Sequence, residues 1–133
     1  MLSPMFHVAL HEPEIAPNTG NLMRLTVNTG CRLHLIEPLG VSLDEAKVRR
    51  AGLDYREYAS VATYPGWSAF VESMGNSRIF AFSQHATTLY TDVAYREGDV
   101  LLFGKESTGL PRPMLGADEV AEAVRIPIAP GGR

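Results

Sequence analysis

The feature that most constrains how this chain folds is an apolar run that ends abruptly in a loop bounded by two glycines. Residues 100–103 are consecutively apolar, which is typical of a strand buried on both faces of a parallel sheet. Gly104 follows at once and allows close backbone approach to a ligand, while Gly109 tolerates conformations that residues with a Cβ resist. Because ligands bind beyond the carboxyl ends of strands in open α/β sheets, this loop is the first expected site.

Other short apolar runs alternate with segments of helical character. Strands are predicted at residues 6–11, 32–36, 55–61, 78–83, 99–103 and 124–128, and helices at 18–29, 43–50, 67–74 and 111–115. Strands that alternate with helices favour right-handed crossovers and a mainly parallel sheet. We therefore predict an α/β fold, with a mainly parallel sheet flanked by helices, in a single domain over residues 1–133.

Composition predicts a soluble protein of the cytoplasm that has no membrane partner. The chain is 45% hydrophobic and 20% charged, as is usual for globular proteins. No apolar run approaches the roughly 20 residues that span a bilayer, and the first residues lack the layout of a signal peptide. The single cysteine, Cys31, excludes an internal disulfide and a zinc site built on cysteines.

The net charge does not indicate a nucleic-acid partner, but a local cluster of basic residues does. The formal net charge is −3, so an RNA contact would need a positive patch. Lys47, Arg49 and Arg50 cluster on the predicted helix at 43–50, and Arg32 lies earlier in the chain. From the charge pattern alone, a solvated helix face is the default interpretation of this cluster, and an RNA-facing patch is the alternative.

Standard nucleotide, metal and hydrolase motifs do not match. Gly104 and Lys105 are followed by Glu106, which breaks a Walker A loop, and no G-x-G-x-x-G or G-x-S-x-G occurs. His7 and His11 share a face of the first predicted strand, but nothing nearby completes a metal site. We therefore interpret both as structural histidines and expect no metal.

The segment from Asn18 to Arg24 opens the first predicted helix. Asn18 is a good N-cap residue, and Arg24 lies near the first turns. A helix N-terminus with a nearby arginine suits a phosphate group. From the residues alone, a capped surface helix and an anion site remain equally open.

Two segments carry a family resemblance. They are Glu-Pro-Glu-Ile-Ala-Pro-Asn-Thr-Gly-Asn at 12–21 with Arg24, and Phe-Gly-Lys-Glu-Ser-Thr-Gly-Leu-Pro at 103–111. Both resemble motifs of the SPOUT (trefoil-knot) RNA methyltransferases, and within that class the TrmL/YibK-like tRNA 2′-O-methyltransferases. Residues 32–38 and 49–55 also resemble that subfamily, so the resemblance covers nearly the whole chain.

The resemblance implies methyl transfer from S-adenosylmethionine to the ribose 2′-hydroxyl of the wobble nucleotide, in the anticodon region of tRNA. S-adenosylhomocysteine is then the product, no metal takes part, and the enzyme is a homodimer with each active site near the subunit interface. The fold implied is the SPOUT α/β knot. The positions that match cofactor-binding loops are Phe82, Ser83, Gly104, Glu106, Gly109 and Ile126.

Three residues match the catalytic motif positions of that family, namely Asn18, Arg24 and Glu106. An arginine is a poor base because its pKa exceeds about 12. We therefore expect Arg24 to hold a phosphate and stabilise developing alkoxide charge, and Glu106 to orient loop amides or Arg24. For contacts with the tRNA backbone the expected residues are Arg32, Lys47, Arg49 and Arg50.

Family members continue through a third motif, containing serine and asparagine, into a helix that threads the knot and completes the cofactor pocket. This sequence stops at Arg133, so we expect the C-terminal knot segment to be truncated, with weak cofactor binding and little activity. Two alternatives are kept. One is a non-catalytic RNA- or cofactor-binding dimer, and the other is an unrelated nucleotide-dependent oxidoreductase, against which the missing glycine fingerprint argues.

Overall fold

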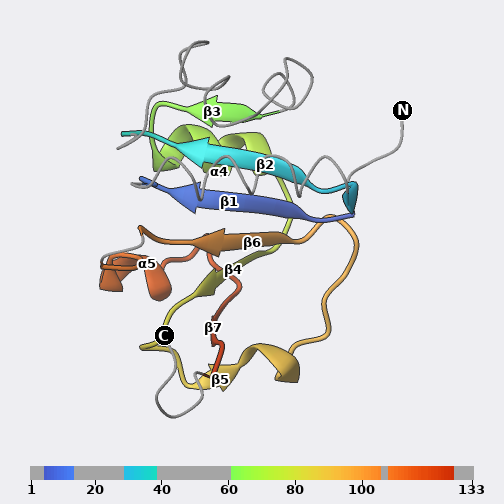
Figure 1. Ribbon diagram of the computed structural model, residues 1–133, viewed down its shortest axis with the longest axis vertical. Helices are drawn as coiled ribbons and strands as arrows, with labels where there is room; N and C mark the ends of the chain where they lie inside the picture. The colour runs from blue at the N-terminus through green and yellow to red at the C-terminus, as the bar shows by residue number, and fades with distance from the viewer. Residues whose placement is uncertain (1–4, 14–28, 39–60, 106–107, 128–133) are drawn as a thin grey trace.

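The computed structural model describes residues 5–13, 29–38, 61–105 and 108–127. Within these segments, seven strands form one sheet in the order β3-β2-β1-β6-β4-β7-β5, and every neighbouring pair is parallel (Figure 1). The strands are β1 (His7–His11), β2 (Arg32–Ile36), β3 (Ala62–Tyr64), β4 (Ile79–Phe82), β5 (Thr88–Leu89), β6 (Val100–Phe103) and β7 (Glu122–Arg125). The helical elements are α4 (Trp67–Met74), α5 (Arg112–Leu115) and the 3₁₀ turn η1 (Tyr90–Asp92). The prediction of an α/β fold with a mainly parallel sheet is confirmed.

Strand β6 lies at the centre of the sheet and joins its two halves. His7 of β1 and Ile79 of β4 both pair with Val100, so the two flanking strands meet β6 in matching register. The chain runs outward from β1 to β3 and then crosses to the other half, so the strand order reverses beside β6. Open α/β sheets bind ligands at such a reversal, beyond the carboxyl ends of the strands. In Figure 1 the arrowheads of β1 and β6 point to the same side, where α5 lies.

The hydrophobic core covers one face of the sheet. Ala9, Leu102 and Ala81 lie side by side across β1, β6 and β4 and are fully buried. Helix α4 packs Phe70 and Met74 into the same cluster, because its apolar residues fall on one helical stripe. Two residues of α5, Met114 and Leu115, pack at the margin of this cluster. The core thereby fixes β1, β6, β4 and α5 relative to one another.

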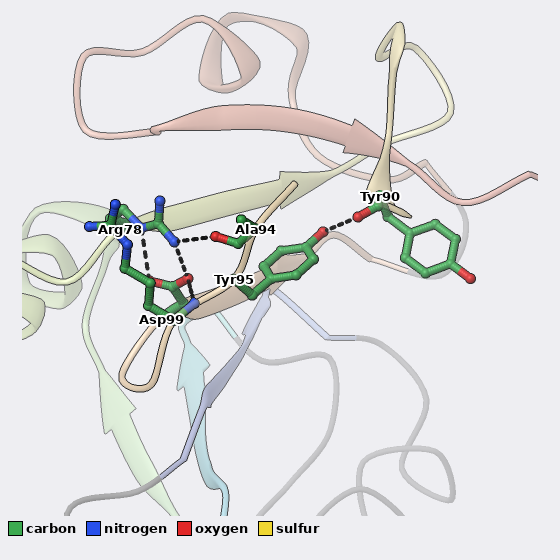
Figure 2. Close-up of polar contacts among 6 residues, drawn as sticks. Arg78, Tyr90, Ala94, Tyr95 and Asp99 are labelled. Carbon is green, nitrogen blue, oxygen red and sulfur yellow. Dashed lines mark hydrogen bonds and ion pairs between the residues drawn. The ribbon is translucent and has the colours of Figure 1, made fainter. Parts of the chain in front are cut away.

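A polar network stabilises the edge of the sheet where β4 and β6 begin, opposite the carboxyl ends of the strands (Figure 2). Asp99 is 3% exposed and accepts hydrogen bonds from Arg78 Nε (3.1 Å) and Nη2 (2.7 Å) and from the backbone N–H of Arg96 (2.7 Å). Arg78 Nη2 also donates to the carbonyl oxygen of Ala94 at 2.9 Å. Burial alone would raise the pKa of Asp99, but these hydrogen bonds and the arginine charges outweigh it and hold that pKa below its usual value. The network joins the start of β4 to the loop that leads into β6.

Several predicted elements are confirmed, and three are corrected. The bounds of β2 and α4 agree with the prediction, and the predicted turn at 111–115 contains α5. The strand predicted at 55–61 is wrong where it can be checked, since the strand is Ala62–Tyr64 and Val61 precedes it. The last strand begins earlier than predicted, at Glu122, and ends at Arg125 because Pro127 cannot donate to a strand ladder.

The segment between the strands predicted at 78–83 and 99–103 contains β5 and η1, for which no element was predicted. A strand of two residues is too short to show a hydrophobic period. Most of the helix predicted at 18–29 and all of the helix at 43–50 lie outside the described residues. None of the helices in the described segments combines the length and apolarity needed to cross a membrane.

Candidate active site

The loop after β6 closes on its own backbone. Lys105 and Gly109 form an antiparallel bridge, with the Gly109 N–H donating to the Lys105 carbonyl oxygen at 2.8 Å. A Cβ added to Gly104 would lie 2.1 Å from the carbonyl carbon of Gly109 and 2.2 Å from the nitrogen of Leu110. Gly109 has φ +72°, the left-handed region predicted for it. The close approach expected between Gly104 and a ligand is therefore made by the backbone of the loop itself.

The predicted cofactor positions fall on the ends of three adjacent strands. Phe82 ends β4 and Ser83 follows it, Gly104 follows β6, and Ile126 follows β7. Since β4 pairs with both β6 and β7 in parallel, the carboxyl ends of these strands meet at one edge. The Ser83 N–H donates to the Val124 carbonyl oxygen at 2.9 Å, which ties the end of β4 to β7. The fold thus brings together loops that are distant in the sequence.

Aromatic and apolar side chains are partly exposed at this edge. The rings of Phe82 and Phe103 stack with centroids 4.6 Å apart, at an interplanar angle of 21°. Both residues are half-buried, and Ile126 is 47% exposed. Backbone groups at strand ends beside apolar rings suit a flat, uncharged ring system such as a nucleobase.

A cleft of about 350 Å³ opens at the same edge of the sheet, between the ends of β1 and β6. It is lined by His11, Glu12, His85, Lys105, Thr108, Gly109, Leu110, Pro111 and Arg112. Lys105, Thr108 and Gly109 belong to the loop at 104–109 that was predicted as a site, whereas the other lining residues were not predicted as site residues. The missing information was the strand order, because only the pairing of β1 with β6 brings residues 11–12 beside residues 105–112.

Three polar contacts face this cleft. Lys105 Nζ lies 3.2 Å from Glu12 Oε1, and His11 Nε2 lies 3.6 Å from Glu12 Oε2. Arg112 Nη2 donates to His85 Nδ1 at 2.9 Å. Burial lowers the pKa of His11; the carboxylate of Glu12 opposes this and the charge of Lys105 adds to it. His11 is therefore neutral at pH 7.

His11 carries an unsatisfied polar atom. Its ring nitrogen Nδ1 is buried and has no hydrogen-bond partner within the described segments. An unmade hydrogen bond of a buried group costs about 1–3 kcal/mol. Such groups are found where a site binds polar ligands.

The other predicted strand histidine, His7, belongs to a separate chain of hydrogen bonds across the sheet. His7 Nδ1 lies 2.8 Å from His34 Nε2, and His34 Nδ1 lies 2.8 Å from the Tyr64 hydroxyl. Burial, and then the neighbouring His7 and Arg32, lower the pKa of His34 to about 3. His34 is thus a neutral core residue. Among the described residues, no group of three His, Cys, Asp or Glu side chains could hold a metal ion.

The remaining predicted site residues are divided between the described and the undescribed parts of the chain. Arg32 begins β2 and is exposed, which places it at the amino-terminal edge, opposite the cleft. The other predicted catalytic and RNA-binding residues lie outside the described residues, and they are Asn18, Arg24, Glu106, Lys47, Arg49 and Arg50.

The fold and this edge define a parallel α/β protein of the class in which ligands bind where the strand order reverses. The chain belongs to the SpoU rRNA methylase family, whose profile matches residues 5–133. A tRNA (cytidine(34)-2'-O)-methyltransferase of Saccharophagus degradans is 49% identical over 129 residues, covering 97% of this chain and 84% of the relative.

Solved structures agree with this assignment. One, described as structural insights into the 2-OH methylation of C/U34 on tRNA, has a TM-score of 0.84 at 39% identity and covers 95% of this chain and 82% of its own. An AdoMet-bound rRNA methyltransferase from Sinorhizobium meliloti has a TM-score of 0.78 at 23% identity, covering 96% of this chain and 50% of its own. At that identity the second likeness shows the fold alone.

Proposed function

We propose that this protein transfers a methyl group from S-adenosylmethionine to the ribose 2′-hydroxyl of the wobble nucleotide of tRNA. The observation that carries the proposal is the convergence of β6, β4 and β7, which puts three loops matched to cofactor-binding motifs at one edge. The similarity to relatives named as tRNA 2'-O-methyltransferases supports the same reaction.

The described residues fit the adenosine part of the cofactor. The half-buried Phe82 and Phe103 rings and the exposed Ile126 supply apolar contact, and the backbone after Ser83 and Gly104 supplies donors and acceptors. When bound, the cofactor supplies a methyl group already activated by its sulfonium. The protein then has to position the ribose hydroxyl in line with that methyl group and exclude competing nucleophiles.

The remaining assignments follow from the family motifs. In this proposal Arg24 stabilises the developing alkoxide, Asn18 and Glu106 position the reacting groups, and Gly109 shapes the loop after β6. Arg32, Lys47, Arg49 and Arg50 contact the tRNA backbone. The same proposal includes a cytoplasmic homodimer that acts on the anticodon region.

The test combines cofactor binding with product mapping. We expect S-adenosylhomocysteine to bind in calorimetric titration and NAD not to bind. We expect labelled methyl groups to reach nucleotide 34 of a tRNA, and a tRNA with a 2′-deoxy nucleotide at that position to take up none. Cofactor binding without transfer would instead favour a non-catalytic binding protein, and failure to bind S-adenosylhomocysteine would contradict the proposal.

A further inference from the structure

The cleft between β1 and β6 has more positive than negative charge. Lys105 and Arg112 contribute two cations, and Glu12 contributes one carboxylate, while His11 is neutral. A volume of about 350 Å³ suits a small ligand or a piece of a larger one. Its charge and size therefore favour an anionic group carried on a larger molecule.

The pair formed by Arg112 and His85 presents further donors. An arginine only donates hydrogen bonds, so His85 Nδ1, which lies 2.9 Å from Arg112 Nη2, must accept. The neutral His85 ring therefore carries its proton on Nε2, where it remains a donor. Arg112 keeps its other N–H groups, because one guanidinium has five. The pair thus combines a fixed positive charge with a neutral donor.

On the other side of the cleft, Lys105 is held by Glu12. Glu12 has φ +53°, an uncommon conformation for a residue with a side chain, and it comes directly after β1. Its N–H donates to the Ile36 carbonyl oxygen at 2.9 Å, which continues the ladder and fixes this conformation. The ammonium of Lys105 lies 3.2 Å from the Glu12 carboxylate and remains 34% exposed. Lys105 is thus oriented at the cleft and still accessible to a second anion.

We propose that this cleft binds a phosphodiester of the RNA substrate, with Lys105 and Arg112 as its charged contacts and His85 and Thr108 as neutral donors. The inference rests on the proposed function and adds two cations that lie outside the set predicted from the sequence. A phosphate fits better than the cofactor carboxylate, because none of the described residues of β7 or of 126–127 after it lines the cleft. A site beside the cofactor loops would hold the backbone next to the reacting ribose.

The test is the salt dependence of binding to an anticodon stem-loop RNA, measured by fluorescence anisotropy with the intact chain. The slope of log K against log salt is negative, and in a single-stranded loop each lost phosphate contact decreases its magnitude by about 0.7. We expect that decrease for Lys105→Gln and for Arg112→Gln, about twice as much for the double variant, and no decrease for Lys105→Arg.

The matched control is Arg96→Gln, which removes the same charge from an exposed side chain near the amino-terminal edge. Its slope should equal that of the unaltered protein. Equal slopes for the Lys105→Gln and control variants would overturn the inference. So would a loss of S-adenosylhomocysteine affinity with the RNA slope unchanged, because the cleft would then hold the cofactor. Methyl transfer to nucleotide 34 by the unaltered protein tests the proposed function separately, whatever the slopes are.

Discussion

At the scale of single residues, Gly104 is the described glycine that leaves the least room for an added Cβ. The neighbours of a new Cβ there are the backbone atoms of Gly109 and Leu110, which the Lys105–Gly109 bridge and the buried Leu110 side chain hold in place. A flexible side chain could move aside, but this backbone cannot move without opening the loop. The loop at the end of β6 therefore requires a residue without a Cβ at position 104.

Gly104→Ala should destabilise the protein by about 1–3 kcal/mol, the usual cost of forcing extra atoms into a packed site. The free energy of unfolding in urea measures this cost. Gly116→Ala is the control, since an added Cβ there meets nothing within 4 Å and its φ of −106° suits alanine. Equal stability of the two variants would mean that the loop does not close as described.

The site could be predicted only in part at this scale. Gly104 and Gly109 were identified from the sequence because they bound the loop after a buried strand, where glycine allows close backbone approach and unusual backbone conformations. Glu12 and Arg112 were missed as site residues, because nothing local distinguishes them from ordinary surface charges. They face the cleft only because β1 pairs with β6 and because α5 follows the loop.

At the scale of elements, the arginine–aspartate network secures the connection that enters β6. The Val100 N–H donates to the Arg78 carbonyl oxygen at 2.8 Å, and the His7 N–H donates to the Asp99 carbonyl oxygen at 2.9 Å. The Tyr95 hydroxyl donates to the Tyr90 carbonyl oxygen at 2.7 Å (Figure 2). The Tyr95 ring also packs edge-on to Phe80. These contacts hold the 90–99 segment against the amino ends of the central strands.

Asp99→Asn should loosen this connection. Hydrogen bonds to a charged group contribute about 1.5–3 kcal/mol each, and an amide oxygen replaces them poorly. We expect amide hydrogen exchange at Val100 to become about tenfold faster or more, since about 1.4 kcal/mol of local stability is a factor of ten. Asp92→Asn makes the same change at an exposed position in η1 and should leave that rate unchanged.

The elements that could be predicted are those with a strong period or an apolar run. Helix α4 shows a clear apolar stripe between two glycines, β6 is a continuous apolar run, and β2 has apolar residues at three of its five positions. Strand β7 begins at Glu122, an exposed residue that accepts a hydrogen bond from the Thr88 hydroxyl at 2.7 Å, so its start depends on a partner strand. Local sequence does not contain that information.

At the scale of the whole molecule, stability should fall in mild acid. Folding lowers the pKa of His34 to about 3 from an ordinary value of 6.5. Above pH 6.5 the imidazole is neutral in both states, and its full contribution to stability is present. Between 6.5 and 3 the unfolded chain binds a proton that the folded protein does not. The free energy of unfolding should then fall by up to about 1.4 kcal/mol per pH unit.

Urea unfolding at pH 7.5 and pH 5 measures this slope, and His34→Gln should make it shallower. Burial also lowers the pKa of His7 and of His11, so a residual slope of the same sign should remain in the variant. A variant whose slope equals that of the unaltered protein would show that His34 is not the group responsible.

The central place of β6 also sets an order of events during synthesis. Strand β1 has β6 as its neighbour on one side, yet β6 comes late in the chain, and its Val100 pairs with His7. At about 5–20 residues per second, β1 waits on the order of ten seconds after translation before that neighbour is made. Until then the β1 edge is unpaired and its apolar residues have no finished sheet to join. A ribosome carrying this chain therefore holds half a sheet with an open edge, and that interval is when the protein most needs protection from aggregation.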